Sequence, residues 1–211
     1  MGTTARSALE DLNRSLITFN QLYGPYPYRA LETQLVFDTV NATYGVEYPG
    51  LIHLITDGNY TASTRRTLQH ETGHQWYYGV LGNDIFNEAW LDEGFAQYSP
   101  YLVETQWYGQ ANADAYWQYV ERVASGTTLP AGLPVWEYGN WSTYHSAVYG
   151  KGAKFLHTLR GRLGNAAFFG ALHDVYGQRR YGVIHKADVL RVMEARSGQD
   201  LDALFQQWLG R

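Results

Sequence analysis

The order of hydrophobic patterns along this 211-residue chain predicts an α+β fold, with a small sheet near the N-terminus followed by a mostly helical lobe. Short strand-like runs occur only in the first 60 residues, whereas from Thr61 onward apolar residues recur at helical spacing nearly to the end. We expect one domain over residues 1–211, in which residues 1–60 form a helix and the sheet and residues 61–211 form the helical lobe.

The N-terminal part contains one helical pattern and two strand-like runs. Apolar residues at helical spacing predict a helix over residues 4–22, which Gly24-Pro25 ends. The runs at 35–37 and 51–55 predict strands. Between them, the stretch from Asn41 to Tyr48 predicts a turn that leads into an extended edge, because Pro49 suits an edge strand better than a central one.

The remaining patterns are helical. They predict helices at 63–80, 90–106, 112–124, 143–163, 165–177, 187–197 and 200–209. The longest irregular segment is 125–142, and a long loop inside a compact domain is often functional.

Composition narrows the possible functions. The net charge is −4 and no basic block is present, so we expect no nucleic-acid partner. No window is apolar enough for a membrane span, and the N-terminus lacks the apolar core of a signal peptide. Met1-Gly2 resembles residues introduced to start expression, in which case a signal peptide or a preceding domain has been removed. The sequence therefore does not predict the cellular compartment of the protein. The absence of cysteine restricts any transition-metal site to histidine and carboxylate ligands.

His70-Glu71-Thr72-Gly73-His74 is an H-E-x-x-H motif within a predicted helix. Residues four apart lie only about 40° apart around a helix, so both imidazoles can bind one ion. Catalytic Zn²⁺ takes three protein ligands and one water, and Glu71 is placed to accept that water's proton. The alternative for the motif alone is an exposed helix whose polar side chains are merely solvated.

A third ligand makes that alternative much weaker. Glu93 follows His74 after 18 intervening residues, on the next predicted helix. A turn through Gly79 and Gly82 lets that helix fold back, so that Glu93 completes a His₂Glu set. We therefore expect one Zn²⁺ per chain.

These residues, with His74-Gln75-Trp76 and Trp90-Leu91-Asp92-Glu93-Gly94, resemble the zinc-binding segments of the M1 family of zinc aminopeptidases, which are gluzincins. The resemblance covers residues 20–210. It implies a thermolysin-like catalytic domain that hydrolyses peptides with Glu71 as general base. It also implies that the flanking domains of a longer parent protein are missing from this chain.

Two further residues receive roles from the resemblance. Tyr149-Gly150-Lys151-Gly152 matches the family's Y-x-K-G segment, whose tyrosine donates a hydrogen bond to the oxyanion. Tyr144 is the nearest competitor for that role. Tyr44-Gly45-Val46-Glu47-Tyr48 stands in the place of the G-A-M-E-N segment, which implies that Glu47 binds the substrate's α-ammonium group.

Several alternatives remain open. Because only the acidic residue of G-A-M-E-N is truly retained, an endopeptidase or broad peptidase on the same site is possible, as is a non-catalytic zinc-binding module. Glu88 and Asp92 are either carboxylates that support a metal-bound histidine or acids at a solvated helix start. The other histidines have no partner at ligand spacing and are expected to be structural or on the surface: His53, His145, His157, His173 and His185.

Overall fold

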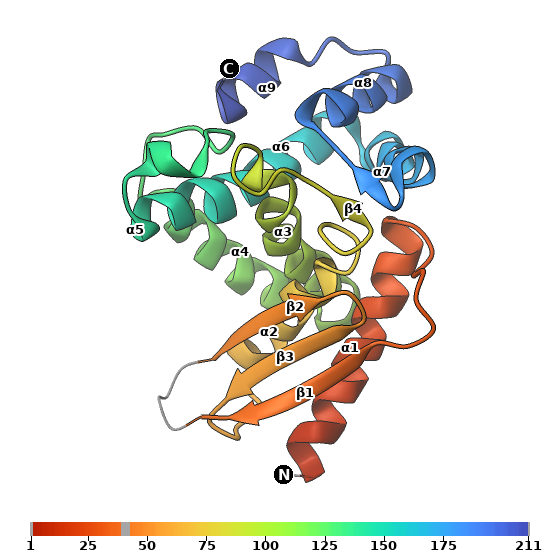
Figure 1. The fold of residues 1–211 in the computed structure, drawn as a ribbon, viewed down its shortest axis with the longest axis vertical. Coiled ribbons are helices and arrows are strands. Elements are labelled where there is room, and N and C mark those ends of the chain that lie inside the picture. Colours follow the sequence, from red (N-terminus) through yellow and green to blue (C-terminus); the bar gives the residue numbers. More distant parts are fainter. Residues whose placement is uncertain (1, 39–42, 211) are drawn as a thin grey trace.

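The computed structural model describes residues 2–38 and 43–210 and confirms the α+β prediction (Figure 1). Helix α1 spans Gly2–Leu22, and strands β1 (Glu32–Phe37), β2 (Tyr44–Tyr48) and β3 (Leu51–Thr56) follow it. The predicted N-terminal helix and strands are thus confirmed. Asn41 and Ala42, within the predicted turn, lie outside the described residues.

The three strands form a sheet in the order β1-β3-β2. Strand β3 is central: it pairs in parallel with β1 and antiparallel with β2, which places Glu47 opposite Ile52. Strand β2 is an edge, as predicted. The next helix, α2 (Ala62–Gly73), packs with α1 against the sheet (Figure 1). A small buried cluster joins these elements: Ala8, Leu12, Ile52, Leu54 and Leu68.

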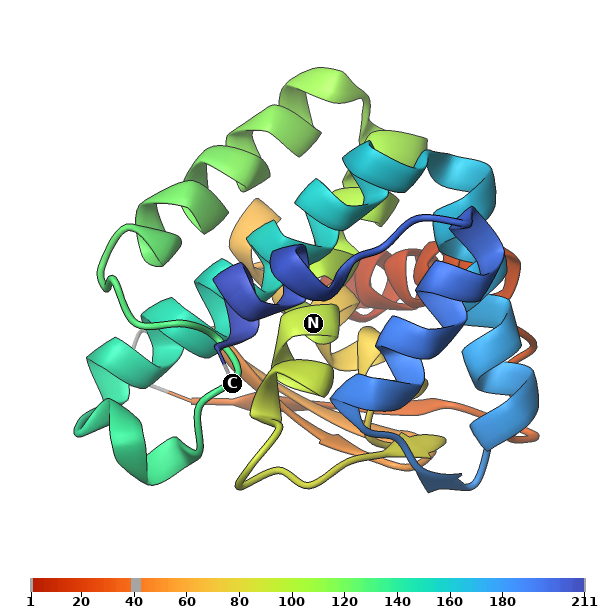
Figure 2. The ribbon, with the colours of Figure 1, turned by 90° about the horizontal axis from the view of Figure 1, so that it is seen from above.

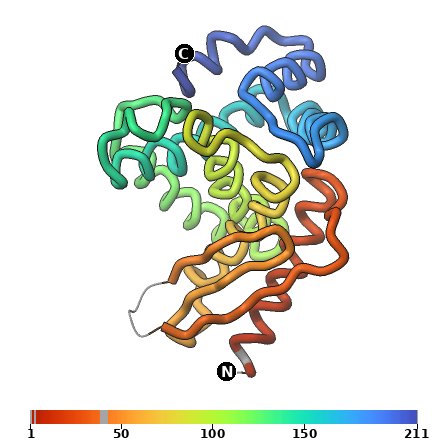
Figure 3. Tube along the Cα trace, in the orientation of Figure 1, coloured from red at the N-terminus to blue at the C-terminus, as the bar shows by residue number. Residues whose placement is uncertain are grey.

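The helical lobe follows and holds the larger core. Its α-helices are α3 (Glu93–Val103), α4 (Gln110–Ala124), α5 (Trp141–Tyr144), α6 (Gly152–Leu163), α7 (Asn165–Arg179), α8 (Lys186–Ser197) and α9 (Asp202–Leu209). The core is rich in aromatic side chains, including Trp76, Trp90 and Phe155. Figure 2 shows the sheet nearly edge-on along one side of the molecule, with the helical lobe on the other. The trace runs from α1 and the sheet at one end to α9 at the other (Figure 3).

The helix predicted over 63–80 is wrong at its C-terminal end, because α2 stops at Gly73. Beyond it the chain turns tightly, with Tyr78 at a φ of 110°. It then forms β4 (Leu81–Gly82), which pairs in parallel with β5 (Gly182–Val183). Local periodicity cannot reveal this pairing, because the partner strand lies about a hundred residues further along the chain.

Two other predicted helices are interrupted. The 90–106 pattern divides into a 3₁₀ turn at Ala89–Leu91, α3, and a π-helical segment at Glu104–Tyr108. The 143–163 pattern begins within α5 and passes through a π-helical segment, His145–Lys151, into α6. The 125–142 segment is not fully irregular, since it contains a 3₁₀ turn at Val135–Tyr138 and the start of α5.

Helices α2 and α3 meet at contact distance at Gly73. A Cβ atom at this position would lie 2.6 Å from Ser99 Oγ and 3.3 Å from Ala96 Cα. Only glycine permits this approach, which brings the end of α2 beside the start of α3. Among residues 2–38 and 43–210, no helix is both long and apolar enough to span a membrane.

Candidate active site

The two histidines of the H-E-x-x-H motif converge at the end of α2. The N-terminus of the helix is capped by Thr61, whose side chain accepts a hydrogen bond from Thr64 N. His70 lies in the last turn, and His74 caps the helix with φ −61° and ψ −17°. Because His74 keeps helical dihedral angles, the i, i+4 relation survives although the helix is shorter than predicted. The two Nε2 atoms lie 3.1 Å apart.

Glu93, in the first turn of α3, completes this group. Its Oε2 atom lies 3.4 Å from the Nε2 atoms of both His70 and His74. That oxygen is buried without a hydrogen-bond partner among the described residues.

The spacing of the three atoms fits a zinc ion. Zn–N and Zn–O bonds of about 2.0–2.1 Å in a tetrahedron require ligand atoms about 3.3–3.4 Å apart. The observed separations of 3.1–3.4 Å form one face of such a tetrahedron. The donor set of two imidazoles and a carboxylate leaves the fourth position for water.

Asp92 supports one of these histidines, which decides between the alternatives left open by the sequence. His74 Nδ1 lies 2.7 Å from Asp92 Oδ1, and the two residues are only 1% and 6% exposed. When Nδ1 donates to Asp92, neutral His74 has its lone pair on Nε2, the atom that faces His70 and Glu93. Glu88 lies elsewhere: its carboxylate bonds to His185 Nδ1 and to the backbone N–H of Lys186.

The charges of the group are strongly coupled. Burial lowers the pKa of His74, but the Asp92 and Glu93 carboxylates outweigh it and raise that pKa well above its ordinary value. Burial raises the pKa of Glu93, but His74 and His70 outweigh it and hold that pKa well below its usual range. Without a cation His74 therefore takes up a proton, so positive charge is favoured at the position where the three ligand atoms converge.

Glu71 lies beside the convergence point and is buried. Its Oε2 atom has no hydrogen-bond partner among the described residues. Burial, with smaller contributions from Glu47 and Glu93, raises the pKa of Glu71 to about 7. Gly45 on β2 makes room for this side chain, because a Cβ atom there would lie 2.3 Å from Glu71 Cγ.

Tyr149 lies on the π-helical segment His145–Lys151, and such segments often occur at functional sites. Its ring stacks parallel to that of His70, with centroids 5.9 Å apart. Burial and the adjacent Glu93 carboxylate raise the pKa of the Tyr149 hydroxyl well above its ordinary value. The segment is anchored by Lys151, whose Nζ donates to the carbonyl oxygens of Thr128 and Leu129.

Glu47 reaches the same region from the edge of the sheet. One carboxylate oxygen each of Glu47 and Glu71 and a ring nitrogen of His74 all lie within 4.8 Å of one another. Gln75 connects this edge to the end of α2, because its Nε2 donates to Tyr48 O and its Oε1 accepts from Gly50 N. The sequence-predicted residues from four elements are therefore brought together.

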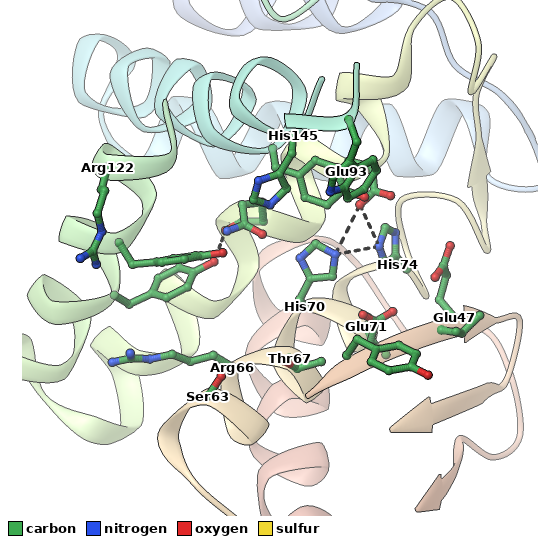
Figure 4. Close-up of a pocket in the computed structure, with 18 of the residues that line it drawn as sticks. Glu47, Ser63, Arg66, Thr67, His70, Glu71, His74, Glu93, Arg122 and His145 are labelled. Atoms are coloured by element: carbon green, nitrogen blue, oxygen red, sulfur yellow. Dashed lines mark hydrogen bonds and ion pairs between the residues drawn. The ribbon is translucent and has the colours of Figure 1, made fainter. Parts of the chain in front are cut away.

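A cavity of about 720 Å³ contains these groups; we call it the cleft. It is lined by the six predicted site residues and by others that include Arg66, Arg122, Trp141 and His145 (Figure 4). Tyr149 lines the cleft, whereas Tyr144 lines a separate small pocket. Arg66 and Arg122 match no sequence motif and were not predicted to line the site. His145 was predicted to be structural or on the surface, yet it lines the cleft as well.

The chain is similar in sequence to proteins named as aminopeptidases. Aminopeptidase M1-D of Oryza sativa subsp. japonica is 26% identical over 92% of this chain, which corresponds to 24% of the rice protein. Aminopeptidase N of Lactococcus lactis subsp. lactis is also 26% identical, over 75% of this chain and 20% of its own length. The chain thus spans about a quarter or less of these curated relatives.

A solved structure has the same fold. The crystal structure of the M1 zinc metallopeptidase from Deinococcus radiodurans superposes with a TM-score of 0.74 at 22% identity, over 95% of this chain and 43% of the other. The family model described as the peptidase family M1 domain matches residues 8–208. Because that match covers nearly the whole sequence, the chain belongs to peptidase family M1.

Proposed function

We propose that this domain is a zinc-dependent aminopeptidase that holds one Zn²⁺ on His70, His74 and Glu93. Support comes from the tetrahedral spacing of their three atoms and from the buried, unpartnered oxygen of Glu93. When bound, the ion polarises the scissile carbonyl and lowers the pKa of a coordinated water towards about 7.

Glu71 is the general base in this proposal. A nearby divalent cation favours the ionised form of a carboxyl, so the pKa of Glu71 falls from its metal-free value of about 7 when the site is loaded. Glu71 then accepts a proton from the attacking water and delivers it to the leaving amine. The Tyr149 hydroxyl, which lines the same cleft, donates a hydrogen bond to the oxyanion as its charge develops.

The position of Glu47 carries the assignment as an aminopeptidase. The ammonium nitrogen of a peptide's first residue is only two bonds, or about 2.5 Å, from that residue's carbonyl carbon. A carboxylate that selects this nitrogen must therefore lie close to the metal and the general base. Glu47 meets this requirement, with a carboxylate oxygen within 4.8 Å of the corresponding atoms of Glu71 and His74.

The test uses Tyr-Ser-Ala, described as the substrate in the structure of a variant of the Deinococcus radiodurans metallopeptidase. We expect wild type to hydrolyse the free peptide with a kcat/KM up to about fivefold above that of its N-acetyl form, since a partly exposed ammonium–carboxylate pair contributes about 0.2–1 kcal/mol. Glu47→Gln should remove the difference. Equal rates in wild type would instead favour the endopeptidase alternative, and bound zinc without hydrolysis would favour a non-catalytic module.

A further inference from the structure

The end of the cleft opposite Glu47 carries two guanidinium groups. Figure 4 shows Glu47 on one side of the ligand group and Arg66 and Arg122 on the other. Arg66 lies on α2 one turn before His70, and Arg122 lies near the end of α4. Both line the same cavity as the metal ligands.

Arg66 has little of its charge compensated. The nearest carboxylate, Glu104, is bound by Arg65 Nε and Nη2 at 2.8 and 2.9 Å and by Gln69 Nε2 at 3.1 Å. Arg66 Nη2 is 3.7 Å from this carboxylate and donates instead to Asn112 O. The Nε atom of Arg66 is buried without a partner among the described residues. Two guanidiniums therefore share one carboxylate, which leaves one net positive charge beside the cleft.

Arg122 adds a second positive charge. It is exposed and forms no ion pair with the part of the chain that the structure describes. The carboxylates that line the cleft, Glu47, Glu71 and Glu93, all gather around the metal position at the other end (Figure 4). The cleft therefore carries opposite charges at its two ends: it is acidic at the Glu47 end and basic at the far end.

We propose that Arg66 and Arg122 bind the free C-terminal carboxylate of a short peptide whose N-terminal ammonium lies at Glu47. This inference rests on the proposed function, because the peptide's direction follows from the role of Glu47. Guanidinium groups are the preferred protein partners of carboxylates, to which they donate paired hydrogen bonds. The two arginines make short peptides with a free carboxyl terminus the preferred substrates.

Helix geometry sets the length of the peptide. Arg66 precedes His70 by four residues, a rise of about 6 Å along α2, and its long side chain extends the reach. Each extended residue spans at most about 3.3–3.6 Å. The arginines therefore suit a carboxylate one to three residues beyond the scissile bond, and a tripeptide places it within that range.

The experiment compares Tyr-Ser-Ala with its C-terminal amide. In wild type, kcat/KM should be roughly fivefold to tenfold higher for the acid than for the amide. Arg122→Gln should remove most of this difference by slowing only the acid, and Arg122→Glu should reverse it. The matched control is Arg6→Gln, an exposed arginine of α1 outside the cleft, which should keep the wild-type ratio.

A third peptide, Tyr-Glu-Ala amide, carries its only carboxylate on a side chain. If Tyr-Glu-Ala amide is hydrolysed as fast as Tyr-Ser-Ala, the arginines also accept a side-chain carboxylate. If it is hydrolysed only as fast as Tyr-Ser-Ala amide, the arginines are specific for the α-carboxylate. Equal rates for acid and amide in wild type would overturn the proposal. So would an equal loss of both activities in Arg122→Gln.

A binding measurement distinguishes failure of the carboxylate-site proposal from failure of the proposed function. Calorimetry on zinc-loaded Glu71→Gln should show tighter binding of the acid than of the amide, and adding Arg122→Gln should abolish the difference. If wild type hydrolysed neither peptide, the proposed function would fail, yet this preference in binding would still establish the carboxylate site. Equal binding of both peptides would refute the site whatever the activity.

Discussion

Replacing Asp92 with asparagine tests how much the orientation of His74 contributes to zinc affinity, because the proposed ligand itself stays in place. Asp92 Oδ1 lies 2.7 Å from His74 Nδ1 in a buried contact. An asparagine oxygen can still accept this hydrogen bond, but it lacks the charge that makes such bonds roughly twice as strong. Losing the outer partner of a zinc-bound histidine lowers metal affinity about 10–100-fold, or about 1.4–2.7 kcal/mol. We expect about tenfold for Asp92→Asn and about a hundredfold for Asp92→Ala.

The assay is competition for zinc between each variant and a chromogenic chelator, with the unfolding midpoint of the metal-free protein measured in parallel. Glu88→Gln is the matched control, because Glu88 lies in the same connection but bonds to His185 and Lys186. Its zinc affinity should equal that of wild type. Wild-type affinity in Asp92→Asn, or an equal loss in Glu88→Gln, would refute the orientation argument.

Three further predictions follow from the site and from its support. Purified protein should contain about one zinc per chain, and His74→Ala or Glu93→Ala should remove most of it; full zinc occupancy in His74→Ala by elemental analysis would contradict the ligand assignment. Tyr149→Phe should keep the metal and lower kcat about 10²–10³-fold with little change in KM, and a near-normal kcat would mean that another donor, such as Tyr144, serves the oxyanion. Asp188→Asn should lower the free energy of unfolding at neutral pH by about 1 kcal/mol, because Asp188 accepts from the His185 N–H ahead of α8 and pairs with Arg179. Burial raises the pKa of Asp188 but these partners hold it below its ordinary value, so in urea unfolding the difference should disappear as the pH falls below about 3.8.

Local patterns were enough to predict most helices and to single out the three residues that the structure brings together at the proposed metal centre. The H-E-x-x-H spacing survives because His74 keeps helical dihedral angles even as the cap of α2. Glu93 could be placed on the next helix, and the structure brings it to 3.4 Å from both histidines. Such features depend on residues close in sequence or on one short connection.

Features that depend on distant partners could not be predicted. Local periodicity reports neither the end of α2 at Gly73 nor the pairing of Leu81–Gly82 with Gly182–Val183. Spacing likewise placed Glu88 and Asp92 near the third ligand without showing that Asp92 contacts His74 whereas Glu88 contacts His185. Arg66 and Arg122 are far apart in the sequence, and only the packing of α4 against the rest of the lobe makes them neighbours in one cavity.

The contact at Gly73 makes the metal centre mechanically asymmetric. Since the backbone of α2 at Gly73 already lies against Ser99 and Ala96 of α3, the two helices can separate but cannot move closer. Motion that separates the helices therefore widens the gap between the histidines and Glu93, whereas motion that brings the helices together is opposed by this contact. A larger divalent ion such as Cd²⁺ can enter by pushing the helices apart, whereas an ion that demands a shorter ligand spacing than zinc meets a steric stop.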